Sequence, residues 1–161
     1  MTVVSTTRDT EALTLTIVAE LAAPPARVWQ VWADPRQLER WWGPPTWPAT
    51  FVAHDVVVGG ASHYFMTGPD GEQVHGWWRF ELLEEPHALE FLDGFADATG
   101  APDDQMPTIR GRVEIAEMPG GTRMTVTSHF ASVEHLDQLL AMGMEEGMTL
   151  AMGQLDEVLA A

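Results

Sequence analysis

The sequence lacks cysteine, has few basic residues and contains no long hydrophobic run. Without cysteine there is no disulfide framework, thiol nucleophile or cysteine-based metal site. Lys and Arg number 8 against 24 Asp and Glu, a formal net charge of −16 that repels phosphate backbones and anionic lipid surfaces. No segment approaches the roughly 18 apolar residues that span a bilayer, and the polar first ten residues show no signal peptide. We therefore expect no nucleic-acid partner, no membrane partner and a cytoplasmic location.

Large apolar side chains are abundant in this sequence. The 161 residues are 45% hydrophobic, enough for one domain with a core, and they include seven Trp and nine Met. Both side chains are common where a protein lines an irregular apolar space, and both also fill ordinary cores. Composition leaves these two interpretations open.

Patterning predicts a strand and two short helices at the start of a single domain spanning residues 11–160, after a flexible tail over residues 1–10. Apolar residues alternate from Leu13 to Leu21, the period of a half-buried strand. Pro25 suits the first turn of a helix over residues 26–32. Asp34 as N-cap and Pro35 predict a second short helix through residue 41, which makes a V with the first.

Six further strands and a long helix follow. The strands are expected over residues 50–58, 61–67, 72–83, 88–95, 108–117 and 122–130, and the tight turns between them predict an antiparallel meander. An apolar stripe over residues 132–159 predicts one long C-terminal helix. Gly143, Gly147 and Gly153 within it suggest close approach to the sheet, or a kink. This fold class is α+β: a curved sheet of about seven strands around a long helix, with an enclosed space between them.

Several motifs, in this order and spacing, resemble a known family. The sequence is similar to the AHSA1-like (activator of Hsp90 ATPase homologue-like) branch of the START/Bet v 1 (SRPBCC) superfamily over roughly residues 11–160. The motifs are Pro25-Ala26-Arg27-Val28-Trp29, Trp41-Trp42-Gly43-Pro44, Asp55-Val56-Val57-Val58-Gly59-Gly60, Gly68-Pro69-Asp70-Gly71, Pro86-His87-Ala88-Leu89-Glu90-Phe91, Gly120-Gly121-Thr122-Arg123-Met124-Thr125-Val126-Thr127, Met142-Gly143-Met144-Glu145-Glu146-Gly147 and Leu155-Asp156-Glu157-Val158-Leu159. The resemblance implies a helix-grip fold with a deep hydrophobic cavity.

The same resemblance implies a wide range of functions. Relatives carry lipids or hormones, cyclise polyketides or, in the eukaryotic namesake, help to activate the Hsp90 ATPase. The namesake has an additional domain for which this chain has no room, so a chaperone partner is not expected. Met148 stands where many relatives have Trp, and Ser62 where many have an aromatic residue, which predicts a cavity of different shape.

Alternation along the strands and helical spacing select the expected cavity wall. Trp41 and Trp42 are expected at the tip of the helical V, either as a platform at the cavity entrance or as a packed plug. Tyr64, the only tyrosine, needs a hydroxyl partner if buried, which a ligand, a water or the backbone could supply. The predicted ligand-binding residues are Trp32, Trp41, Trp42, Tyr64, Met66, Trp78, Phe80, Phe91, Val126, Met144 and Met148.

Catalytic candidates are fewer. His54, His63 and His75 could meet across neighbouring strands, and a cavity histidine beside a carboxylate would be a possible general base. Asp55 is a further candidate, although its place before a Gly-Gly turn favours a structural role. The histidines lack the spacing of a zinc site, so no metal and no cofactor are expected.

Three functional hypotheses follow. The first is binding of a small hydrophobic or aromatic ligand in the cavity. The second is a polyketide cyclase-like or hydrolase-like enzyme that uses a cavity His or Asp. The third is an Hsp90-activator-like interaction module in a stress response. A homodimer is compatible with all three.

Overall fold

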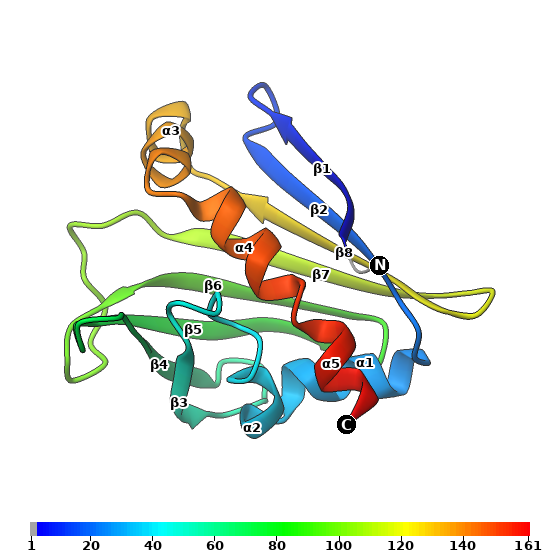
Figure 1. Ribbon diagram of the computed structural model, residues 1–161. Helices are drawn as coiled ribbons and strands as arrows, with labels where there is room; N and C mark the ends of the chain where they lie inside the picture. The colour runs from blue at the N-terminus through cyan, green and yellow to red at the C-terminus, as the bar shows by residue number, and fades with distance from the viewer. Residues whose placement is uncertain (1–2) are drawn as a thin grey trace.

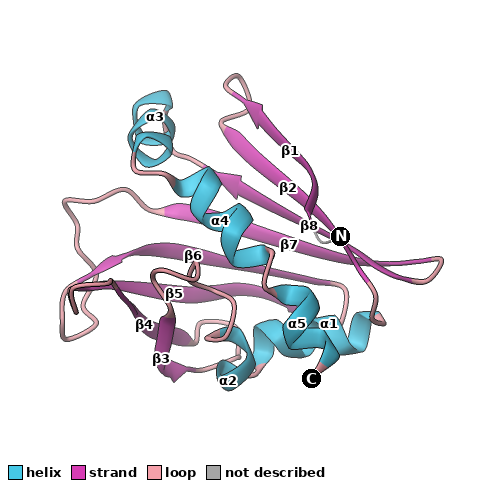
Figure 2. Cartoon of the chain, viewed as in Figure 1, coloured by secondary structure: helices cyan, strands magenta, loops and turns pink. Residues whose placement is uncertain are grey.

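The computed structural model describes residues 3–161 as one curved antiparallel sheet with helices on one face (Figure 1). The eight strands lie in the order β1-β2-β8-β7-β6-β5-β4-β3. Figure 2 shows the helices crossing the concave side of this sheet. The strands are β1 Val3–Asp9, β2 Thr14–Leu21, β3 Ala49–His54, β4 Ala61–Thr67, β5 Gln73–Glu84, β6 Ala88–Ala96, β7 Ile109–Met118 and β8 Gly121–His129; the helices are α1 Pro25–Ala33, α2 Pro35–Leu38, α3 Val133–Ala141, α4 Met144–Met152 and α5 Leu155–Ala160.

The architecture confirms the predicted α+β helix-grip class. Each strand from β2 onward pairs antiparallel with its neighbours, and β2 alternates buried and partly buried residues along its whole length. Pro25 and Pro35 stand at the starts of α1 and α2, and the Asp34 carboxylate accepts a hydrogen bond from the Arg36 backbone N–H at 2.9 Å. The predicted second helix is shorter than expected and ends at Leu38.

The prediction of a flexible tail is wrong for residues 3–9, which form β1, a strand additional to the seven that were predicted. Residues 1 and 2 lie outside the described residues. β1 pairs with β2 as an edge strand. Most of its side chains are exposed, so hydrophobic patterning gave no signal, and the strand is held by the backbone ladder. An ion pair between Arg8 and Glu145, 2.7 Å apart, also joins it to α4.

The prediction of one continuous C-terminal helix is also wrong. Gly143, with φ of 87°, adopts the left-handed conformation that ends α3 and starts α4 in a new direction. A second break separates α4 from α5 at Gly153 and Gln154, where the Gln154 amide donates a 2.7 Å hydrogen bond to the carbonyl of Gly43. The kink interpretation therefore holds for Gly143 and for Gly153. At Gly147 a Cβ would have no neighbouring atom within 4 Å, so close approach to the sheet does not explain this glycine.

The predicted strand over residues 50–58 is shorter than expected and ends at His54. Residues 55–60 form turns instead. The Gly60 N–H donates to the carbonyl of Val57, and a side chain on Gly60 would lie within 2.1 Å of the Asp55 carbonyl oxygen. Backbone packing at Gly60 therefore stops the strand despite its run of valines.

Two clusters of buried side chains make up the core. The main cluster fills the end where α1 and α5 meet, and includes Trp32, Trp41 and Trp78. A smaller cluster holds α3 against the other end of β2, with Leu15, Leu136 and Leu139 at its centre. Between the two clusters the helices stand away from the sheet, which is where the cavity lies.

Candidate functional site: a cavity with a buried acid

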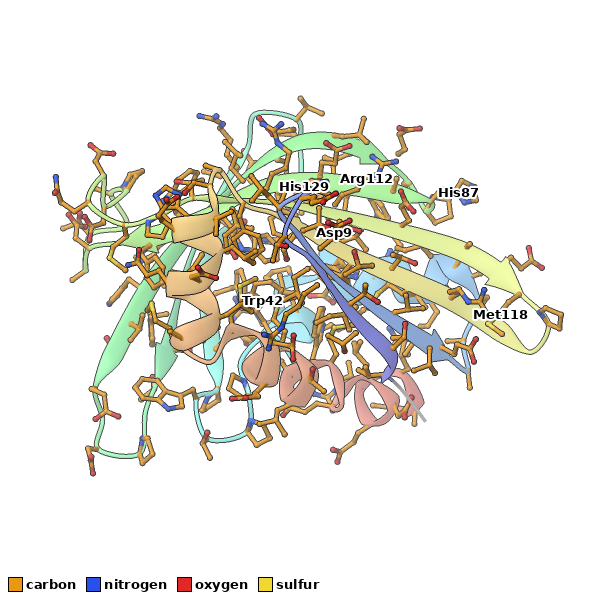
Figure 3. The ribbon with its side chains drawn as sticks, turned by 90° about the horizontal axis from the view of Figure 1, so that it is seen from above. Asp9, Trp42, His87, Arg112, Met118 and His129 are labelled. Atoms are coloured by element: carbon orange, nitrogen blue, oxygen red, sulfur yellow. The ribbon has the colours of Figure 1, made fainter. Side chains whose placement is uncertain are left out.

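A cavity of about 390 Å³ lies between the sheet and the C-terminal helices. Strands β4 to β8 form one wall, and α3, α4 and the segment after α2 form the other. Apolar side chains predominate on both walls. Figure 3 shows Trp42 in the interior, between the helices and the sheet.

The structure divides the predicted ligand-binding residues into two sets. The cavity wall contains Trp42, Tyr64, Met66, Phe91, Val126, Met144 and Met148. Solid core contains Trp32, Trp41, Trp78 and Phe80. For the residues in the wall, contact with a ligand stays a prediction.

The tryptophans near α2 show why the two sets differ. Trp41 is 1% exposed, its indole N–H donates to the Val31 carbonyl at 2.9 Å, and its ring meets that of Trp32 edge to face at 4.8 Å. Trp41 is therefore the packed plug of the V. Trp42, the next residue, also packs against Trp32 and Trp78, but it lines the cavity as well.

A carboxylic acid that sequence analysis missed, Asp93, faces this cavity. Phe91, Asp93 and Phe95 on β6 all line the cavity, as the period of a strand requires. Its Oδ1 accepts a 2.9 Å hydrogen bond from the Tyr64 hydroxyl. The alternation that selected Phe91 also predicts an inward Asp93, so the signal was present in the sequence.

A glycine makes the Tyr64–Asp93 contact possible. Tyr64 lies on β4 and Asp93 on β6, with β5 between them. Gly76 on β5 pairs with Tyr64, and a Cβ there would lie 2.3 Å from Cζ of the tyrosine ring. The ring can cross β5 to reach the acid because Gly76 has no side chain.

Burial raises the pKa of the Asp93 carboxyl from 3.8 to about 7. The Tyr64 hydrogen bond acts in the opposite direction, as does the nearby Trp78 indole N–H, whose geometry falls short of a direct hydrogen bond. Asp93 as a whole is half-buried and lines the cavity. Burial and the adjacent Asp93 raise the pKa of Tyr64 well above its ordinary value, so the hydroxyl stays a donor.

Two further polar groups belong to the cavity wall. Ser128 on β8 is buried and faces inward on the same side of the strand as Val126. The buried indole N–H of Trp42 has no hydrogen-bond partner among residues 3–161. An unpaired donor of this kind is costly in a dry interior and is normally satisfied by water or ligand. Ser128, like Asp93, could have been found by strand alternation.

The histidines predicted to meet are only partly brought together. Nε2 of His63 lies 2.9 Å from Nδ1 of His75, at the edge of the cavity. His54 is apart from them: its Nε2 donates to the Trp32 carbonyl at 2.8 Å, so its Nδ1 accepts from the Ser62 hydroxyl at 2.7 Å. Burial lowers the pKa of His54, and this neutral imidazole connects β3, β4 and α1.

The remaining catalytic candidate, Asp55, is exposed and lies outside the cavity wall. Its backbone N–H donates to the Ala61 carbonyl, in the turn between β3 and β4. Among residues 3–161, no three His, Cys, Asp or Glu side chains are placed to hold a metal ion. Within the same range, no helix has the length and hydrophobicity needed to cross a bilayer.

Comparison with known proteins identifies the family. The model of the family described as activator of Hsp90 ATPase homolog 1-like protein matches residues 22–160. The chain belongs to this family. No curated protein matches the chain.

Solved structures agree with membership of the activator of Hsp90 ATPase homolog 1-like family. The chain is 53% identical to a protein from Arthrobacter aurescens, with a TM-score of 0.94 over 99% of this chain and 92% of the other. It is 49% identical to protein Ms6760 from Mycobacterium smegmatis, with a TM-score of 0.90 over 97% and 96%. An AHSA1 protein from Silicibacter pomeroyi is 20% identical over 91% and 97%, and its TM-score of 0.72 shows a shared fold.

Proposed function

We propose that this protein binds a small, mainly apolar ligand in the cavity between the sheet and α4. The observation that carries the proposal is a cavity of about 390 Å³ with mostly apolar walls, which also include Asp93 and Ser128. Pockets of about 300–1,000 Å³ with mostly apolar walls and a few convergent polar groups are typical of small-molecule sites.

Apolar burial supplies the affinity in this proposal, and the polar groups set orientation. A bicyclic aromatic molecule buries about as much surface as a tryptophan side chain, roughly 250 Å². At about 25 cal/mol per Å² this contributes about 6 kcal/mol before the entropic cost of association. The flexible side chains of Met144 and Met148 on α4 allow the wall to adapt to ligand shape.

No comparable observation favours the alternative functions. Of the catalytic candidates, His54 and Asp55 do not reach the cavity, and His75 lies at its edge, where its ring contacts that of His63.

The proposal is tested with the neutral fluorescent probe N-phenyl-1-naphthylamine and a variant that fills the cavity. Gly147 lines the cavity and has open space where a side chain would lie, so Gly147→Leu should occupy the ligand volume. The helix should tolerate leucine, because glycine is worse by about 1 kcal/mol in a helix interior. Ala160→Leu adds the same side chain at the exposed end of α5 and serves as the control.

We expect saturable fluorescence enhancement with one site per chain in the native protein and in Ala160→Leu. Gly147→Leu should weaken binding at least about tenfold while keeping a native circular dichroism spectrum. If Gly147→Leu binds the probe as the native protein does, the probe is not in the cavity and the proposal fails.

A further inference from the structure

The described wall of the cavity contains one carboxyl group and no lysine or arginine. Within the described residues, the titratable side chains in its wall are Asp93, Tyr64 and His75, and no lysine or arginine accompanies them. A carboxylate or phosphate ligand would find no lysine or arginine to pair with and would lie close to the Asp93 carboxyl. Burying an unpaired charge is costly, so the wall selects against anionic ligands.

The Asp93 carboxyl has acceptor capacity that the protein leaves unused. Its Oδ1 accepts from Tyr64, the Trp78 indole N–H lies nearby without a direct hydrogen bond, and no other donor to this carboxyl is present in residues 3–161. A carboxylate can accept about four hydrogen bonds, and its strongest partners are charged donors. The polar group that fits this position is therefore a donor, and a cationic donor above all.

The surroundings of the acid are aromatic. Trp42, Tyr64 and Phe91 line the cavity. The centroid of the Trp42 ring lies 6.2 Å from that of Tyr64 and 6.4 Å from that of Phe91. Phe95 lies two residues beyond Asp93 on the same face of β6. Aromatic rings attract cations through their π-electrons, most strongly where water is excluded. The formal net charge of −16 adds a field that draws cations toward the protein.

We propose that the cavity accepts a hydrophobic amine, whose ammonium group pairs with Asp93 and contacts the adjacent aromatic rings while its apolar body lies against Val126 and the methionines of α4. The inference rests on the proposed function and narrows it to one chemical class. It assigns Asp93 as the residue that determines specificity, with Tyr64 as a positioning residue that holds its carboxyl.

Three naphthalene probes that differ in one polar group test this: 2-(aminomethyl)naphthalene, 2-(hydroxymethyl)naphthalene and 2-naphthoate. We expect calorimetric titration at pH 8.5 to show the amine binding about tenfold or more tighter than the alcohol, and the carboxylate weakest. In Asp93→Asn, which keeps an acceptor for Tyr64, the advantage of the amine should fall below about threefold. The alcohol should bind the variant as it binds the native protein, which shows that the cavity is intact.

The pH dependence supplies an independent readout. Affinity for the amine should fall as pH decreases through 7, because the Asp93 carboxyl takes up a proton, and it should be flat in Asp93→Asn. Of the other groups facing the cavity, Tyr64 stays neutral throughout. The other titratable group in the described wall is His75, and in His75→Asn the affinity for the amine should still fall as pH decreases. The segments packed opposite, from α3, α4, β7, β8 and residues 42–47, contribute no titratable side chain to the described wall.

The outcomes separate the two proposals. Equal binding of all three probes, with Gly147→Leu blocking each, supports cavity binding and overturns the preference for amines. An amine preference that persists in Asp93→Asn, or tighter binding of the carboxylate, also overturns it. If none of the probes binds, cavity binding itself fails, and the inference fails with it.

Discussion

Replacing Asp93 with asparagine should make the folded protein more stable at alkaline pH, although Asp93 forms a hydrogen bond in the native state. The folded pKa of this carboxyl is about 7, against 3.8 as its ordinary value. The native protein therefore holds a proton that the unfolded chain has released between about pH 4 and pH 7. Because of that difference, the free energy of unfolding of the native protein falls as pH rises from about 4 to 7.

The magnitude follows from the two pKa values. A difference of about three in pKa corresponds to about 4 kcal/mol above pH 7, which is the cost of ionising this acid inside the cavity. Asparagine has nearly the same shape, carries no charge and offers an amide oxygen to the Tyr64 hydroxyl. The variant should therefore exceed the native protein in free energy of unfolding by about 1.5 kcal/mol at pH 5 and by up to about 4 kcal/mol at pH 8.

Urea denaturation followed by tryptophan fluorescence at several pH values measures this difference. Asp70→Asn, in the exposed turn between β4 and β5, is the matched control and should change stability by less than about 0.5 kcal/mol at each pH. The reasoning is refuted if Asp93→Asn is less stable than the native protein at pH 8, or if its advantage does not change with pH. A stabilising substitution at Asp93, the proposed specificity residue, would indicate that the native acid lowers the stability of the fold in favour of function.

Three further predictions concern residues that shape the site. Gly76→Ala should destabilise by about 2–4 kcal/mol through overpacking and loss of the Tyr64 hydrogen bond, and a urea double-mutant cycle should show this cost vanishing in a Tyr64→Ala background. His54→Ala should cost about 1–3 kcal/mol at pH 8 by urea denaturation, because Ser62 and the Trp32 carbonyl lose their partner. Since the folded pKa of His54 is lowered, that contribution should shrink as pH falls below 6.5; a cost independent of pH would contradict the assignment. Gly143→Ala should lower stability by about 1–2 kcal/mol in thermal denaturation, because alanine is strained at a φ of 87°; an unchanged melting temperature would contradict this.

Sequence patterns predicted the parts of the fold that depend on local chemistry. Alternation indicated β2, and prolines marked the first turns of α1 and α2. The patterns did not indicate β1, because an exposed edge strand is held by backbone hydrogen bonds and needs no apolar face. The patterns also predicted one helix where the structure has α3, α4 and α5, since the apolar stripe continues across Gly143 while the backbone changes direction there.

The sequence by itself determined which side chains point inward, and hence that Tyr64, Phe91, Asp93 and Val126 share the concave face. Tertiary structure alone decided which inward residues border a cavity and which pack solidly, because that depends on the separation between helix and sheet. It also decided that Tyr64 meets Asp93 across β5. That contact joins residues 29 positions apart, and it depends on the space left by a glycine on the strand between them.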